Sequence, residues 1–144
     1  MKRHEALIPF SREHHDALIL SRLIQKGAPV YRGLPTRIKE KADYALELFS
    51  VKLKEHFTAE EKMLALINTS DKELLLLFNE IRAEHVLLEH QFISLQTAQA
   101  LEEKLDKLGR DLEQHIRKEE RVLFELIQER CSEDVLEKIK MIIH

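Results

Sequence analysis

Three histidines in this chain are each followed, four residues later, by a glutamate. The pairs are His56–Glu60, His85–Glu89 and His115–Glu119. Four residues is about one turn of an α-helix, so the two side chains of a pair project from one helix face. Converging imidazoles and carboxylates bind metals, whereas an isolated pair on a helix surface is an ordinary polar contact. The chain has eight histidines among 144 residues, and their placement decides between these two interpretations.

The composition predicts an all-α protein. Apolar residues make up 44% and charged residues 34% of the chain, with three glycines and three prolines. Few helix breakers, together with abundant Ala, Leu, Glu, Lys and Arg, favour helices throughout. We expect one domain over residues 1–144, because this length is typical of a single domain with its own core.

Helix-starting and helix-breaking residues divide the chain into four long helices and a short fifth. Ser11, Thr36, Ser70 and Ser132 are predicted N-caps, and "GAPVYRGLP" is a predicted loop. The uninterrupted pattern after Ser70 would form a helix of about 55 Å, too long for a domain of this size, so we predict a turn near 97–102. The expected fold is an up-down-up-down antiparallel four-helix bundle with a short C-terminal fifth helix.

Three of the histidines are expected to lie at one level of this bundle. In antiparallel neighbours, residues equally distant from the connecting turn share a level. The midpoint of His56 and His85 falls at residues 70–71, and the midpoint of His85 and His115 falls at residue 100, in the predicted turn. Each histidine also continues an apolar stripe of its helix, so we predict that all three point inward.

Two carboxylates are expected to join them. Glu60 and Glu119 lie one turn beyond an inward histidine, and an unpaired carboxylate in a core is costly unless a cation accompanies it. The first helix adds "EHH", in which His14 shares a face with apolar residues. We favour His14 as the inward residue, with His15 as the alternative. His90 is expected to be exposed or to support a ligand.

This set of ligands favours a site for two metal ions. Imidazole with carboxylate suits iron, manganese or zinc. Two bridging carboxylates and four histidines exceed what one tetrahedral zinc would use. The ferritin-like pattern requires Glu-x-x-His twice, and this sequence has none. Two other interpretations remain open, namely unrelated surface pairs and neutral core histidines bonded to glutamates without metal.

The motifs resemble those of the hemerythrin family, specifically the bacterial hemerythrin-like domains with His-His-Glu cation-binding motifs. They are "EHH" at 13–15, "HFTAEE" at 56–61, "EH" at 84–85 and "HIRKEE" at 115–120. The resemblance implies a four-helix bundle around two iron ions with an oxo or hydroxo bridge. The terminal ligands that it implies are His14 or His15, His56, His85 and His115, and the bridging carboxylates are Glu60 and Glu119.

One position departs from the oxygen-carrying hemerythrins, which have His-x-x-x-His on the third helix. Here the second of those positions is Glu89. We expect it to supply a third carboxylate, or to leave a position to water or His90. A more anionic shell should favour ferric iron. The sequence therefore predicts a di-iron protein that handles dioxygen or another small oxidant, or senses iron or redox state, rather than a reversible oxygen carrier.

Two alternative functions come from other classes. Similar domains are associated with nitric oxide detoxification and iron–sulfur cluster repair, but those repair proteins carry an N-terminal cysteine-bearing region that this sequence lacks. The other alternative is a metal-free helical interaction module.

Charge and hydropathy limit the partners. The net charge of −3 provides no basic face for nucleic acid, and no apolar run is long enough to span a membrane. One cysteine, Cys131, and a start without a secretory apolar segment favour the reducing cytoplasm. The sequence identifies no protein partner.

Overall fold

The computed structural model describes residues 2–142, and those residues form helices and loops without a strand. In chain order the elements are α1 (Ile8–Leu23), α2 (Ile38–Leu48), η1 (Phe49–Leu53), α3 (Lys54–Leu66), α4 (Lys72–Ser94), α5 (Leu101–Lys118), η2 (Glu119–Leu123), α6 (Phe124–Arg130) and α7 (Glu133–Lys140). The predicted all-α class is confirmed. None of these helices is long and apolar enough to cross a membrane.

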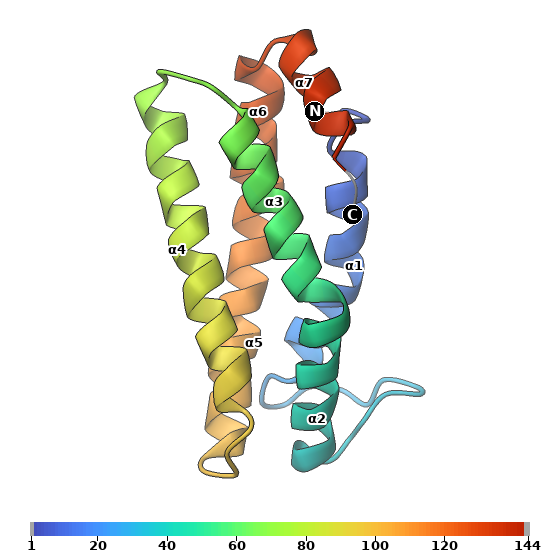
Figure 1. The fold of residues 1–144 in the computed structure, drawn as a ribbon. Coiled ribbons are helices and arrows are strands. Elements are labelled where there is room, and N and C mark those ends of the chain that lie inside the picture. The colour runs from blue at the N-terminus through green and yellow to red at the C-terminus, as the bar shows by residue number, and fades with distance from the viewer. Residues whose placement is uncertain (1, 143–144) are drawn as a thin grey trace.

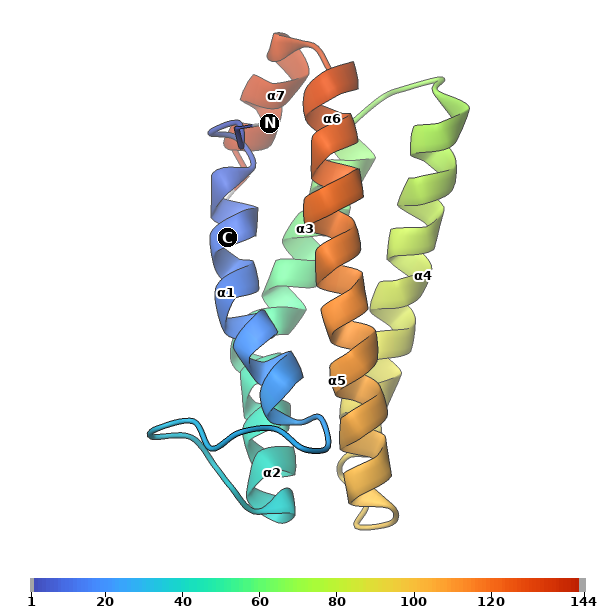
Figure 2. The same cartoon turned by 180° about the vertical axis from the view of Figure 1, so that it is seen from behind.

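The elements form four helical rods. The π-helical turn η1 joins α2 to α3 without a break, and η2 joins α5 to α6 in the same way. These two rods lie beside α1 and α4, and the chain direction alternates from one rod to the next (Figures 1 and 2). The short helix α7 lies across one end, near the start of the chain. The turn predicted near 97–102 is present, because α4 ends at Ser94 and α5 begins at Leu101.

The helix starts agree with the sequence patterns in part. Thr36 does not cap the second helix as predicted, because α2 begins at Ile38 after Arg37 and no side chain caps it. Ser132 caps α7 as predicted, and its side chain accepts a hydrogen bond from the Val135 N–H. The cap of α4 is Asp71 rather than the predicted Ser70, and its carboxylate accepts from the Leu74 N–H at 3.2 Å. An ionised carboxylate is the stronger acceptor, and it also suits the positive end of the helix dipole.

The prediction that Ser11 caps the first helix is wrong. Helix α1 already begins at Ile8, with Pro9 in its first turn. Proline is well tolerated there because its missing N–H would have no helical partner. The Ser11 hydroxyl instead donates to Glu120 at 2.7 Å, which ties α1 to the fourth rod.

The core consists of two apolar clusters separated by a polar layer. The first, which we call the α7-side cluster, includes Phe10, Met63, Phe78, Leu123, Phe124 and Leu136. The second, the α2-side cluster, includes Leu20, Phe49, Phe57, Phe92, Leu105 and Leu112. On every rod, the buried histidine and glutamate positions fall between residues of one cluster and residues of the other. The polar layer therefore crosses the middle of the bundle.

A glycine allows α1 and α5 to approach closely. A Cβ atom added at Gly109 would lie 2.5 Å from the main-chain oxygen of Ser21 and 2.8 Å from the side chain of Gln25. The first distance is too short for any larger residue without a shift of one helix. Gly109 thus sets the separation of two rods that both contribute to the polar layer.

Candidate metal centre

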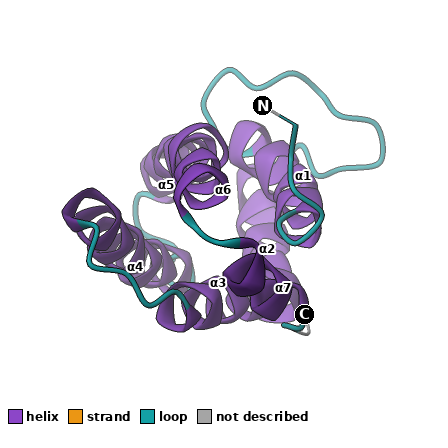
Figure 3. Cartoon of the chain, turned by 90° about the horizontal axis from the view of Figure 1, so that it is seen from above, coloured by secondary structure: helices purple, strands orange, loops and turns teal. Residues whose placement is uncertain are grey.

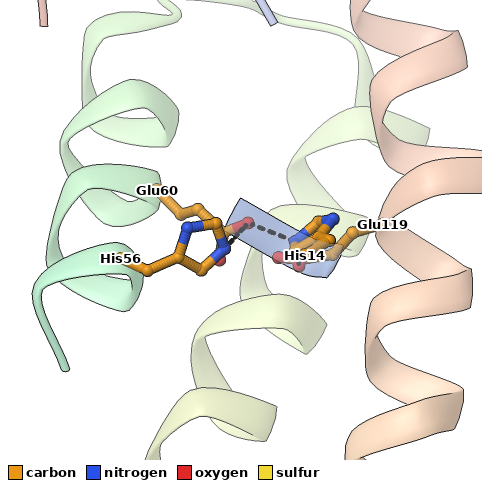
Figure 4. Close-up of side chains that lie close together, drawn as sticks. All are labelled: His14, His56, Glu60 and Glu119. Carbon is orange, nitrogen blue, oxygen red and sulfur yellow. Dashed lines mark hydrogen bonds and ion pairs between the residues drawn. The ribbon is translucent and has the colours of Figure 1, made fainter. Parts of the chain in front are cut away.

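Six side chains from all four rods converge in the polar layer. They are His14 from α1, His56 and Glu60 from α3, His85 from α4, His115 from α5 and Glu119 from the first position of η2. All are between 0% and 3% exposed. Each occupies an inward position of an amphipathic helix, where the periodicity that buries Leu and Phe buries it as well. Figure 4 shows four of them pointing toward one another.

One half of the layer joins α1 to α3. His14 Nε2 lies 2.9 Å from Glu119 Oε1 and 3.3 Å from Glu60 Oε2. His56 Nε2 lies 3.0 Å from the same Glu60 oxygen. One ligand atom from each of these four residues lies within 4.8 Å of the others. The four atoms therefore surround a space suited to one ion.

The other half joins α4 to α5. His85 Nε2 lies 3.0 Å from Glu60 Oε1 and 3.6 Å from Glu119 Oε2. His115 Nε2 lies 3.3 Å from Glu119 Oε1. These four residues form a second group within 4.8 Å. Glu60 and Glu119 belong to both groups, and Glu60 turns one oxygen toward each, which is the arrangement of a bridging carboxylate.

Several of these buried atoms lie near an oppositely charged group but make no hydrogen bond of acceptable geometry with the described residues. They are His56 Nε2, His115 Nε2 and both carboxylate oxygens of Glu119. Leaving a buried polar atom unsatisfied costs about 1–3 kcal/mol, and more for a charged group. Imidazole nitrogens and carboxylate oxygens that converge in this way are the ligand atoms that a cation requires. The residues present therefore fit a pair of metal ions.

The outward ring nitrogens face a second set of carboxylates that the sequence patterns did not predict. The Nδ1 contacts are His56 to Glu13 at 2.9 Å, His85 to Glu61 at 3.0 Å, His115 to Glu84 at 2.7 Å and His14 to Glu120 at 3.5 Å. A carboxylate that accepts the Nδ1–H holds the ring so that Nε2 faces the centre. We call these four glutamates the outer carboxylates.

The outer carboxylates link the rods in a closed cycle. Each one is the sequence neighbour of an inward ligand on one rod, and it contacts the histidine of the next rod. Glu13 on α1 contacts the histidine of α3, Glu61 on α3 that of α4, Glu84 on α4 that of α5, and Glu120 on η2 that of α1. The available signal was the Glu beside each inward residue in "EH" and "EE", but those letters do not reveal the partner helix.

The carboxylates change the protonation of the histidines. Burial alone would lower the pKa of each imidazole, but the neighbouring glutamates outweigh it. They raise the pKa of His56 and of His115 to about 9, that of His85 to about 10, and that of His14 well above its ordinary value. Without a metal the histidines are therefore protonated at neutral pH, and the imidazolium charges balance the buried carboxylates.

The two shared glutamates respond in the opposite sense. Burial raises the pKa of Glu60, but the charge on His56 and close contacts with His14, His56 and His85 bring it well below the ordinary value. Burial and the charge of Glu60 both raise the pKa of Glu119, yet contacts with His115 and His14 lower it to about 2. Both carboxylates are thus ionised at neutral pH and available to a cation.

Three residues predicted as ligands or supports lie outside the two groups. His15 and His90 are both exposed. On the first helix it is therefore His14, and not His15, that lies in the polar layer. Glu89 is half-buried and lines a groove beside His85. The direction of α4 explains this placement. Because α4 runs opposite to α3 and α5, a residue one turn after its histidine lies toward the α2-side cluster, away from the shared carboxylates.

The comparisons with known proteins agree with this chemistry. A family model described as the hemerythrin HHE cation binding domain matches residues 7–127, a range that contains all six converging side chains. Neither the curated proteins nor the solved structures gave a match.

Proposed function

Because the chain belongs to the hemerythrin HHE cation-binding family, we propose that it binds two iron ions and handles dioxygen or another small oxidant, or senses iron or redox state. The observation that carries this proposal is the sharing of Glu60 and Glu119 by two ligand groups. His14 and His56 would hold one ion, and His85 and His115 the other. The bound iron pair, with a solvent-derived oxo or hydroxo bridge, would supply the redox chemistry.

A site that must also take an external molecule favours iron over zinc. Each group offers two imidazoles and two carboxylates, and both carboxylates are common to the two groups. Four protein donors would complete a closed tetrahedral zinc site, whereas iron takes further ligands and keeps positions for solvent and an external molecule. Manganese accepts the same mixture of nitrogen and oxygen ligands and is the second choice. We further propose that residues 1–144 act as one antiparallel four-helix-bundle domain.

The surroundings favour a small substrate. The converging side chains are at most 3% exposed, and apolar clusters lie on both sides of them. A groove of about 390 Å³ between α3 and α4 reaches His85, and its lining includes Phe57, Glu61 and Val86. A buried layer that is reached from such a groove suits a diatomic molecule or a small oxidant.

Iron loading tests the proposal. Metal-free protein is loaded with ferrous iron without oxygen, freed of excess metal and then exposed to air. We expect about two irons per chain and the absorption bands of an oxo-bridged ferric pair. Glu89→Gln is the matched control and should keep both ions, because Glu89 lies outside both groups. One ion per chain, or none, would contradict the proposal.

The iron-loaded protein also distinguishes the proposed function from the two alternative functions. Fast consumption of nitric oxide by the reduced, loaded protein, without reaction with dioxygen, would favour nitric oxide chemistry or cluster repair. A metal-free interaction module would instead take up no iron and show equal thermal stability before and after the loading procedure.

A further inference from the structure

One face of α4 points away from the other rods (Figure 3), and exposed apolar side chains lie on it. Nine large apolar side chains are exposed in the described part of the chain, and five of them belong to this helix: Leu75, Leu76, Val86, Leu87 and Ile93. The inner face of α4 is apolar too, since it contributes to both core clusters. A helix that is apolar on both faces is normally covered on both.

The spacing on this face is that of a coiled-coil seam. Leu76, Asn79, Ala83, Val86, His90 and Ile93 follow one another at alternating intervals of three and four residues, and all six are exposed. This is the a/d spacing at which two helices pack side by side, and it extends over about 25 Å of the helix at 1.5 Å per residue. We call these six residues the α4 seam. Its form points to a helix as the covering partner.

We propose that a second copy of this chain covers the α4 seam, with the two α4 helices antiparallel about a two-fold axis at the level between residues 84 and 85. In this register, residues equally distant from the axis meet: Leu76 with Ile93, Asn79 with His90, and Ala83 with Val86. Apolar side chains meet apolar ones, and the two polar positions meet each other as donor and acceptor. A two-fold contact requires this self-complementarity.

The charges beside the seam select the antiparallel orientation. Arg82 and Glu89 flank the same edge of the seam, and both are half-buried. In the antiparallel pair these edges face each other, and Arg82 lies about 3 Å along the axis from the level of the second copy's Glu89. The contact occurs twice. In a parallel pair Arg82 would instead face Leu87, and the carboxylate of Glu89 would gain no partner.

The other edge of the seam introduces no unpaired acidic residue near the middle of the contact. Its acidic residue near the middle, Glu80, is already paired with Lys118 at 2.7 Å within its own bundle. The side chain of Glu89, by contrast, has no ion pair or hydrogen bond with the described residues. His85 projects from the opposite side of α4, so the seam contains no metal ligand, although Val86 lies at the border between the seam and the groove that reaches His85. Dimer formation and metal binding are therefore separate properties, and each can fail alone.

The molar mass in solution tests the dimer. Sedimentation analysis of the full chain is carried out at protein concentrations up to about 1 mM, so that a dimer with a millimolar dissociation constant is still detected. We expect a molar mass of twice the chain mass of 17.0 kDa. Val86→Lys should give monomers, because it places two ammonium groups in the middle of the seam. Val51→Lys is the matched control, since Val51 is 60% exposed and Val86 56%. A monomeric wild-type chain, or equal loss of dimer in both variants, would overturn the proposal.

A charge exchange tests the orientation. Arg82→Glu should raise the dimer dissociation constant at least about tenfold, because each new carboxylate would face Glu89. The double variant Arg82→Glu with Glu89→Arg should restore the wild-type constant. A double variant as weak as the single one would overturn the antiparallel register. Circular dichroism checks that every variant keeps its helices.

Discussion

The polar layer and the two apolar clusters around it are equally buried, yet they contribute differently. The clusters exclude water from side chains such as Phe78 and Phe124, and that burial stabilises the bundle. The layer encloses charged carboxylates and imidazoles whose burial opposes folding until opposite charges compensate. The difference indicates that the clusters determine the fold and that the layer serves the metal. Changes in either region should therefore affect different measurements.

The largest effect is expected from a shared carboxylate. Glu60→Ala removes an oxygen donor from both groups at once, so the iron content should fall from about two per chain to nearly zero, while the helices remain. Metal analysis after loading measures the loss, and circular dichroism monitors the fold. If Glu60→Ala retained both ions, the two groups would not share this residue as a ligand.

A cavity in a cluster should have the opposite outcome. Phe78→Ala removes a side chain that is 1% exposed in the α7-side cluster. We expect the free energy of unfolding of the metal-free protein to fall by about 3–5 kcal/mol. Chemical denaturation gives that value. At denaturant concentrations below the unfolding midpoint, the Phe78→Ala variant should still bind as much iron as the wild type. A loss of iron under those conditions would show that the apolar clusters and the polar layer do not act separately.

Removing an outer carboxylate should weaken metal binding without abolishing it. Glu84→Gln replaces the acceptor of His115 Nδ1–H, and the metal dissociation constant should rise about 10- to 100-fold. Competition with a chelator measures the change. Glu80→Gln is the matched control, because Glu80 and Glu84 both pair with Lys118 but Glu84 alone of the two contacts a histidine. Equal effects of both variants would assign the loss to Lys118 instead.

The smallest effect is a difference in pH dependence. The raised pKa values of the histidines stabilise the metal-free fold fully below the unfolded value of 6.5, and this contribution is lost as pH rises through about 9 to 10. The lowered pKa of Glu119 contributes above 4.5 and is lost as pH falls through about 2. Metal-free protein should therefore be most stable between about pH 4.5 and 6.5.

The metal-loaded protein should show the opposite trend above that range, because metal competes with protons for the imidazoles. The melting temperatures of the metal-free and the metal-loaded protein are compared at about pH 5.5, 7.5 and 9.5. The difference between the two melting temperatures should increase as the pH rises. Parallel curves would mean that the histidines do not bind the metal.

The sequence predicted the fold class and most of the inward residues because both depend on local spacing. A histidine and a glutamate one turn apart on an apolar stripe share a helix face and are expected to point inward, and the level of His56 and His85 followed from the turn between them. The role of Glu89 could not be read in this manner. The same spacing places a carboxylate beside the shared pair on α3 and α5, and away from it on α4, which runs in the other direction.

The outer carboxylates were beyond prediction for a related reason. Glu13 and Glu84 look like surface residues of their own helices, and their contacts with His56 and His115 depend on how neighbouring rods are rotated. The predicted N-caps Ser11 and Ser70 were also wrong. The acceptor strength of Asp71 and the tolerance of Pro9 in a first turn outweighed the serines nearby.

Anomalous diffraction from crystals of the iron-loaded protein tests the central claim most directly. We predict two peaks per chain, one beside His14 and His56 and one beside His85 and His115, with Glu60 and Glu119 next to both. A single peak, or a peak that depends on Glu89 or His90, would contradict the two-metal assignment.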